Sequence, residues 1–196
     1  MIHYLPIDIP KLNIPSSINY DGFVEDPLPY HGSHMSLFHE NEWFPHGQWQ
    51  RDNWSWLKKY IEENLPIKKF VMIRTSIQLS KIDIHFDTSG INERGKNLYN
   101  ENLTNHYNSL TSPYGYRLVI SGKSGTLLIH NNSQTIPATL PDSTNCYCLN
   151  SFHTLHSTDD DDGRVIVLIQ GWLDEDKHNQ IINRSLLKYK EHIIAF

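Results

Sequence analysis

Alternating hydrophobic and polar positions indicate strands over much of the second half of the chain. Residues 68–87, KKFVMIRTSIQLSKIDIHFD, alternate apolar side chains with polar ones and are rich in β-branched residues, which is typical of β-structure. YRLVI at 116–120 and TLLIH at 126–130 flank Ser-Gly-Lys-Ser-Gly, a pattern that predicts two strands about a glycine turn. Two further strands are expected at NCYCLN, residues 145–150, and at RVIVLIQGWL, residues 164–173.

Helical periodicity is confined to two segments. Asp52 is a polar cap position, the apolar residues Trp54, Leu57 and Ile61 share one helical face, and Pro66 ends the segment. The residues from 174 to 194 predict a terminal helix. The closely spaced prolines of residues 1–50 disfavour a long helix there and indicate an irregular or short-stranded wrap.

These elements predict a mainly β fold, an antiparallel barrel or sandwich with flanking α-helices. Alternating βα units are absent, which argues against Rossmann-type and TIM-barrel arrangements. At 196 residues the chain is expected to form one domain. Its expected parts are a wrap and helix at 1–66, a β core at 67–174 and a C-terminal helix at 175–196.

Charge and composition limit the binding partners and the cellular compartment to be expected for the chain. The formal net charge is −5 and no Lys/Arg cluster is present, so direct binding to duplex nucleic acid is not expected. No apolar run approaches the length of a membrane span, and the first residues lack the pattern of a signal peptide, so a cytoplasmic location is expected. Cys146 and Cys148 lie two apart in a predicted strand and are expected to be reduced thiols.

The first candidate for chemistry is His85-Phe86-Asp87. In a strand, residues i and i+2 project from the same face, so the imidazole and the carboxylate can converge on one metal ion. The tripeptide alone is weak evidence because the chain has 12 histidines. A capping aspartate beside an ordinary polar histidine is the simpler interpretation of the tripeptide taken by itself.

A distal histidine strengthens the metal interpretation. NSFHTLHSTDDDDGRVIVLIQGWLD predicts a hairpin with a histidine at its head and a return strand that begins at Arg164. Two histidines and one carboxylate on one face of an iron leave three positions for a chelating cosubstrate and dioxygen. A buried Arg164 requires a partner, and a carboxylate of such a cosubstrate could provide it.

With these motifs in hand, residues 84–174 resemble the core of the iron(II)- and 2-oxoglutarate-dependent oxygenases, most closely the aspartyl/asparaginyl β-hydroxylase-type branch. The matching elements are His85-Phe86-Asp87, YRLVI at 116–120, Asn150-Ser151-Phe152-His153, and Arg164 leading VIVLIQGWLD. The resemblance implies a double-stranded β-helix, that is, a jelly-roll or cupin-like barrel. It also implies Fe(II) bound by His85, Asp87 and His153, and 2-oxoglutarate anchored by Arg164.

Several assignments stay open at this stage. Arg164 is eleven residues beyond His153 and eight beyond His156; the spacing in the family favours His153, and the two histidines should face opposite ways. Arg117 is a second candidate for holding the cosubstrate or a substrate acid, and a cross-strand partner of a surface carboxylate is the alternative. Arg74 has the same two interpretations.

The resemblance implies hydroxylation of a C–H bond, with dioxygen as co-substrate, and the branch that it resembles suggests an amino acid or a peptide side chain as the substrate. The retained Asp87 favours hydroxylation over halogenation, because halogenating relatives vacate that position for chloride. Two rival hypotheses are a cupin-type metal enzyme that does not use 2-oxoglutarate and a non-catalytic jelly-roll binding module.

Overall fold

The protein is described by a computed structural model over residues 1–25, 32–85, 115–151, 154–159 and 163–196. The larger elements are the helices α1 (Gln48–Asn64) and α3 (Glu175–Lys188) and the strands β3 (Gly32–His39), β5 (Ile67–Gln78), β7 (Tyr116–Ser121) and β12 (Arg164–Leu173). The shorter strands are β1 (Ile2–Pro6), β2 (Val24–Glu25), β4 (Glu42–Trp43), β6 (Ile82–His85), β8 (Leu127–His130), β9 (Thr135–Pro137), β10 (Cys146–Leu149), β11 (Leu155–Thr158) and β13 (Ile194–Ala195). A 3₁₀ turn, Lys190–His192, follows α3.

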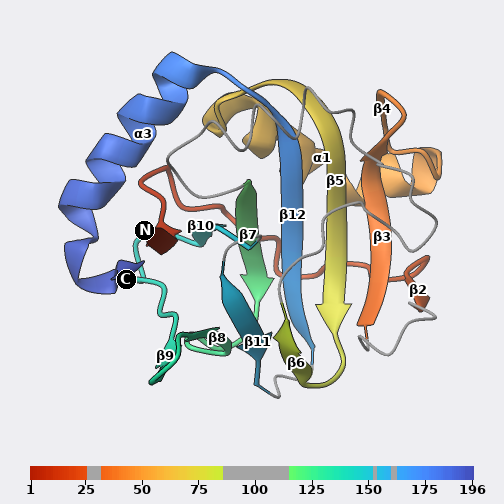
Figure 1. The fold of residues 1–196 in the computed structure, drawn as a ribbon. Coiled ribbons are helices and arrows are strands. Elements are labelled where there is room, and N and C mark those ends of the chain that lie inside the picture. The colour runs from red at the N-terminus through yellow and green to blue at the C-terminus, as the bar shows by residue number, and fades with distance from the viewer. Residues whose placement is uncertain (26–31, 86–114, 152–153, 160–162) are drawn as a thin grey trace, which may run out of the picture.

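These strands form two antiparallel sheets. The larger has nine strands in the order β13-β1-β10-β7-β12-β5-β3-β2, with β4 beside β3. The smaller has four strands in the order β6-β11-β8-β9, and in Figure 1 it lies against the lower part of the larger sheet. The mainly β fold with flanking helices is therefore confirmed.

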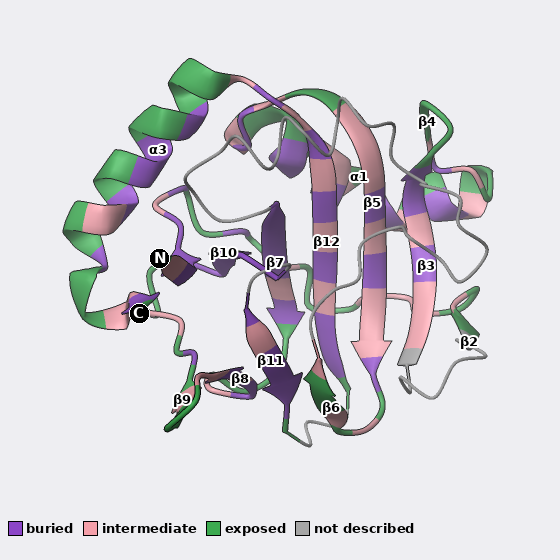
Figure 2. Ribbon diagram, viewed as in Figure 1, coloured by how far each residue is buried: buried purple, intermediate pink, exposed green. Residues whose placement is uncertain are grey.

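The face of the large sheet that α1 covers carries the main hydrophobic core. Along β12 the residues Val165, Val167 and Ile169 are almost fully buried, whereas the positions between them are half-buried (Figure 2). Trp54 and Leu57 of α1 belong to the same buried cluster, so the apolar face of the helix covers this side of the sheet. The buried side chains that alternate along β12 thus pack with the apolar face of α1. Both patterns, the alternation in the strand and the helical spacing, are those that the sequence predicts.

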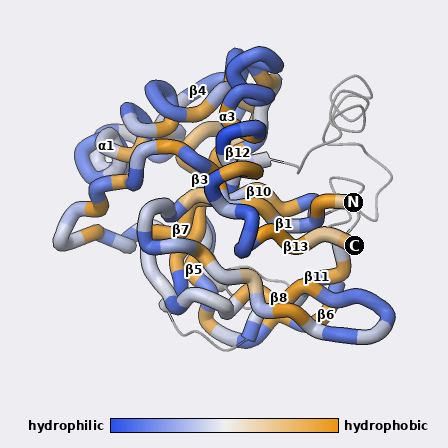
Figure 3. Tube along the Cα trace, turned by 90° about the vertical axis from the view of Figure 1, so that its left-hand side faces the viewer, coloured by the Kyte–Doolittle hydropathy of each residue, from blue (hydrophilic) through white to orange (hydrophobic). Residues whose placement is uncertain are grey.

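The other face of the large sheet is turned toward the small sheet. A second buried cluster lies there and joins Tyr4 and Tyr147 of the large sheet to Leu127 and Ile129 of β8. Hydrophobic residues in Figure 3 accordingly concentrate on the strands, and the connecting loops are largely hydrophilic. We call the surfaces that face each other across this cluster the inner faces of the two sheets.

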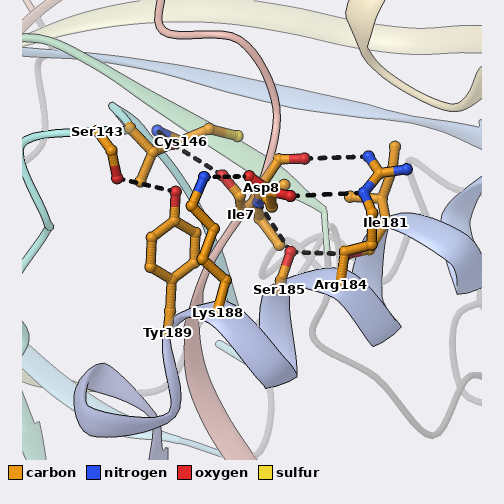
Figure 4. A network of polar contacts seen from close by, with 10 residues as sticks. Ile7, Asp8, Ser143, Cys146, Ile181, Arg184, Ser185, Lys188 and Tyr189 are labelled. Carbon is orange, nitrogen blue, oxygen red and sulfur yellow. Dashed lines mark hydrogen bonds and ion pairs between the residues drawn. The ribbon is translucent and has the colours of Figure 1, made fainter.

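Helix α3 is tied to the segment that follows β1 by contacts to Asp8 (Figure 4). Lys188 Nζ lies 2.6 Å from Asp8 Oδ1, and Arg184 Nε lies 3.4 Å from Asp8 Oδ2. The Asp8 amide donates to Ser185 Oγ at 2.8 Å. At the start of the helix, Asp174 Oδ1 accepts a hydrogen bond from the Lys177 amide, an ordinary N-cap contact.

The two strands predicted about the glycine turn are confirmed as β7 and β8, although they do not pair with each other, and the hairpin predicted to return through Arg164 is wrong. β7 and β8 do follow one another about the glycine turn, but β7 pairs with β10 and β12 in the large sheet and β8 pairs with β9 and β11 in the small one. Likewise β11 and β12 belong to different sheets. In both places the chain crosses between sheets, because β7 and β12 each have both edges occupied by strands distant in sequence.

The other predictions about local structure differ less from the observed structure. Helix α1 begins at Gln48, four residues before the cap expected at Asp52, and ends before Pro66 as predicted. Residues 1–50 contribute β1 and the eight-residue β3 to the large sheet, more regular structure than a wrap. Cys146 and Cys148 are unbridged and buried. No helix in the described part of the chain is both long and apolar enough to cross a membrane.

Candidate functional site

The structure brings His85 and His156 together on neighbouring strands of the small sheet. They are register partners across the antiparallel β6–β11 pair, and their ring centroids are 4.3 Å apart. Residues directly opposite one another in such a pair project from the same face. His156 also pairs with the fully buried Ile129, which packs between the sheets. The two imidazoles therefore lie side by side on the inner face.

The hydrogen bonds of these two rings define which nitrogen could bind a metal. Nδ1 of His85 is 2.7 Å from the Asp83 carbonyl oxygen, and Nδ1 of His156 is 2.8 Å from the Thr154 carbonyl oxygen. A carbonyl oxygen only accepts, so Nδ1–H must donate in both rings. In the neutral imidazole the lone pair is then on Nε2. Histidines that bind metals usually donate their other N–H to a carbonyl or carboxylate in this way.

Arg164 is the buried cation predicted from the sequence. Its side chain is 4% exposed at the start of β12, and its Nη2 donates to the Tyr147 hydroxyl across a long 3.5 Å. Its Nε is buried and has no hydrogen-bond partner among the described residues. A buried guanidinium without a carboxylate costs several kcal/mol, so this position is suited to an anionic ligand.

A cavity of about 160 Å³ lies beside Arg164. Tyr4, Tyr147 and Leu127 line it from the inner faces, and the turn between β7 and β8 also lines it. Among the described residues its lining includes the cations Lys11, Lys123 and Arg164 and one acidic residue, Asp142, so cations predominate there.

Tyrosines complete the inner part of this cavity. Burial, and to a smaller extent Tyr147, raise the pKa of Tyr4, so its phenol stays neutral and can donate its proton. That hydroxyl donates to the Thr139 carbonyl at 3.1 Å. The cavity thus offers the guanidinium of Arg164 and the neutral hydroxyl of Tyr4.

The histidine pair and Arg164 are offset along the strands. Arg164 pairs with Gln78, Ile82 pairs with Thr158, and the Gln78 amide donates to the Asp159 carbonyl at 2.8 Å, so these residues share one end of the two sheets. His156 is two residues from Thr158, which at about 3.3 Å per residue is roughly 7 Å along the strand. A short dicarboxylate could span that offset.

Arg117 lies on the inner face as well. It is 7% exposed, pairs with Tyr147 on one side and with Leu168 on the other, and its Nη1 donates to the Leu149 carbonyl at 3.4 Å. Because the side chain is buried, a surface ion pair does not describe it. A role in holding the cosubstrate stays a prediction.

Two of the predicted iron ligands, Asp87 and His153, lie outside the described residues, and their roles stay predictions. Within the described ranges no group of three or more His, Cys, Asp or Glu side chains is arranged to hold a metal ion. Sequence reasoning missed Tyr147, the neighbour of Arg164. Alternation within β10 could have found it, because Tyr147 must face away from the two cysteines that flank it.

Comparisons with known proteins add little to this geometry. No family model and no curated protein matches the sequence. One solved structure that matches is a crystal structure of an oxidoreductase of the 2OG-Fe(II) oxygenase family from Burkholderia pseudomallei. The match has 11% sequence identity and a TM-score of 0.37, and it covers 76% of this chain and 71% of that chain. A similarity of this size carries no argument about the chain's activity.

Proposed function

We propose that the protein is an Fe(II)- and 2-oxoglutarate-dependent dioxygenase that hydroxylates a C–H bond of an amino acid or peptide side chain. One observation carries the proposal: paired histidines lie on the inner face of one sheet, and the inner face of the other carries a buried arginine that has no carboxylate partner among the described residues. Histidine nitrogens are suitable ligands for iron, and a guanidinium is suited to the far carboxylate of 2-oxoglutarate.

The proposed architecture is a double-stranded β-helix, or jelly roll. The strands β5, β12, β7 and β10 are neighbours in the large sheet, and β6, β11, β8 and β9 are neighbours in the small one. From β5 to β12 the chain changes sheet at every step except the β8–β9 turn. This alternation supports a jelly roll and explains why β7 does not pair with β8 and why the hairpin predicted to return through Arg164 is absent.

In the proposed site His85, Asp87 and one distal histidine hold Fe(II), which leaves positions open for the cosubstrate and dioxygen. When bound, the iron and 2-oxoglutarate supply the oxidising chemistry: 2-oxoglutarate and dioxygen yield succinate and carbon dioxide, and one oxygen atom enters the substrate C–H bond. The protein's own groups have simpler tasks. Asp83 and Thr154 orient the two rings through their carbonyls, and Arg164 fixes one end of the cosubstrate.

The distal ligand is His153 or His156. The spacing to Arg164 favours His153, whereas the ring contact with His85 favours His156. Single alanine variants decide between them through succinate release. His130→Ala is the matched control, because His130 pairs with Leu155 on the opposite face of the small sheet from His156. The variant of the true ligand should lose succinate formation, and the other histidine variant and the control should keep most of it.

Anaerobic spectroscopy tests the function as a whole. Addition of Fe(II) and then 2-oxoglutarate should produce a weak visible charge-transfer band. Iron uptake with no spectral response to 2-oxoglutarate would favour the cupin-type enzyme, and absence of iron uptake would favour the binding module. Either of these results would overturn the proposal.

A further inference from the structure

Arg74 is a third arginine on the inner face of the large sheet. It lies within β5 and pairs with Leu168 of β12 on one side and with Ser36 of β3 on the other. Leu168 pairs in turn with Arg117, so Arg74 and Arg117 lie in one row across the sheet. Register partners share a face, and Arg164 is on that face because it precedes Leu168 by an even number of residues.

The side chain of Arg74 has no hydrogen-bond or ion-pair partner in the described part of the chain. Its side chain is half-buried, its Nε is buried, and that nitrogen has no hydrogen-bond acceptor among the described residues. Its neighbours across the strands, Leu168 and Ser36, bear no charge. Arginine remains protonated in proteins, so this position carries a permanent cation with bidentate donors.

The position of Arg74 separates it from the proposed cosubstrate anchor. Arg164 and its partner Gln78 are at the end of the sheets where Ile82 pairs with Thr158. Arg74 is four residues from Gln78, about 13 Å along β5 at roughly 3.3 Å per residue. His156 is two residues, roughly 7 Å, from the same end. Along the strands, the histidine pair therefore lies between Arg164 and Arg74.

We infer that Arg74 binds a carboxylate of the substrate that is oxidised, so that the substrate is a carboxylic acid such as a free amino acid or a peptide with an acidic group. The inference rests on the proposed function for the identity of the reaction. A cosubstrate that runs from the histidines to Arg164 leaves Arg74 on the other side of the metal ligands. One guanidinium flanked by uncharged residues matches a singly charged carboxylate in a bidentate pair.

The test detects carboxylate binding at Arg74 without iron or 2-oxoglutarate, so its failure is distinct from failure of the proposed function. The Nε–H signals of the arginines are recorded by ¹H–¹⁵N NMR in the metal-free protein. The Arg74 signal is assigned by its absence in Arg74→Lys, with Arg74→Gln as a second assignment variant. The probes are N-acetylglycine, which has a carboxylate, and N-acetylglycinamide, which has the same shape without the charge.

N-acetylglycine should shift the Arg74 signal saturably, with half-saturation at about 10 mM, and the amide should require at least about tenfold more. The shift should persist in Arg164→Gln, which removes the proposed anchor of the cosubstrate. It should also persist in Arg51→Lys, a change to an exposed arginine of α1. A signal that does not respond, or that responds equally to the amide, would overturn the inference. So would a shift that disappears in Arg164→Gln.

Discussion

Replacing Arg164 with methionine should stabilise the ligand-free protein and abolish its response to 2-oxoglutarate. Methionine keeps an unbranched side chain of similar reach but removes a charge that is 4% exposed. Among the described residues the guanidinium has one long side-chain contact, 3.5 Å to Tyr147, and its buried Nε has no partner. Exchanging buried ionic groups for apolar ones of similar size often stabilises by 1–4 kcal/mol. We expect about 2 kcal/mol, which is about 4–8 °C in Tm for a chain of this length.

The ligand response should change in the opposite direction. With Fe(II) under argon, 2-oxoglutarate at about 100 times its Kd should stabilise the wild type by about 2.7 kcal/mol and the variant by nothing measurable. Differential scanning calorimetry gives both quantities, and Arg51→Met on the exposed side of α1 is the matched control. If ligand-free Arg164→Met melts below the wild type, the guanidinium is already well paired and the reasoning for an anion site there fails.

Four further predictions concern the cosubstrate, the metal, the packing and the thiols. Arg164→Lys should raise the KM for 2-oxoglutarate at least about tenfold, or 1.4 kcal/mol, because lysine lacks the planar fork; an unchanged KM would make the arginine structural. Asp87→Ala should abolish tight iron binding in calorimetric titrations without unfolding the protein, and an unchanged affinity would remove Asp87 from the site. Gly171→Ala should lower the free energy of unfolding in urea by about 3 kcal/mol, because its Cβ would lie 2.5 Å from Ile67 Cγ2; a loss under about 1 kcal/mol would show that the strands separate easily. Burial raises the pKa of both Cys146 and Cys148, so iodoacetamide at pH 8 should label them only after unfolding. Because the unfolded thiols ionise near pH 9.0 and the folded ones at higher pH, stability should fall as pH rises above 9 by about 1.4 kcal/mol per unit and per thiol.

The strands and helices were predictable because their patterns are local. β12 alternates between a buried and a half-buried face, and α1 repeats its apolar residues at helical spacing. Pairing was not predictable in the same way. The glycine turn between β7 and β8 suits a hairpin, but both edges of β7 are taken by β10 and β12, which are distant in sequence. A local pattern gives the face that a strand buries, not the partner that covers its edge.

In the candidate site, too, local patterns predicted some features, and other features depend on which strands pair. The burial of Arg164 followed from the apolar strand that it begins, and the structure confirms it. The contact between His85 and His156 depends on the register of β6 against β11, which neither segment contains by itself. That the Arg74 side chain has no partner among the described residues likewise depends on its neighbours Leu168 and Ser36, which come from strands far from it along the chain.

The crossing of the chain between sheets also determines when the histidine pair can exist during folding. His85 and His156 are separated by about 70 residues, so their contact closes a long loop and gains nothing from local structure. Folds dominated by such distant pairings form in milliseconds to seconds, far more slowly than helical bundles. An unfolded or half-assembled chain presents its histidines singly. Tight capture of a metal ion in a refolding experiment should therefore appear only after β6 and β11 have joined, as a late event that follows the formation of the individual strands.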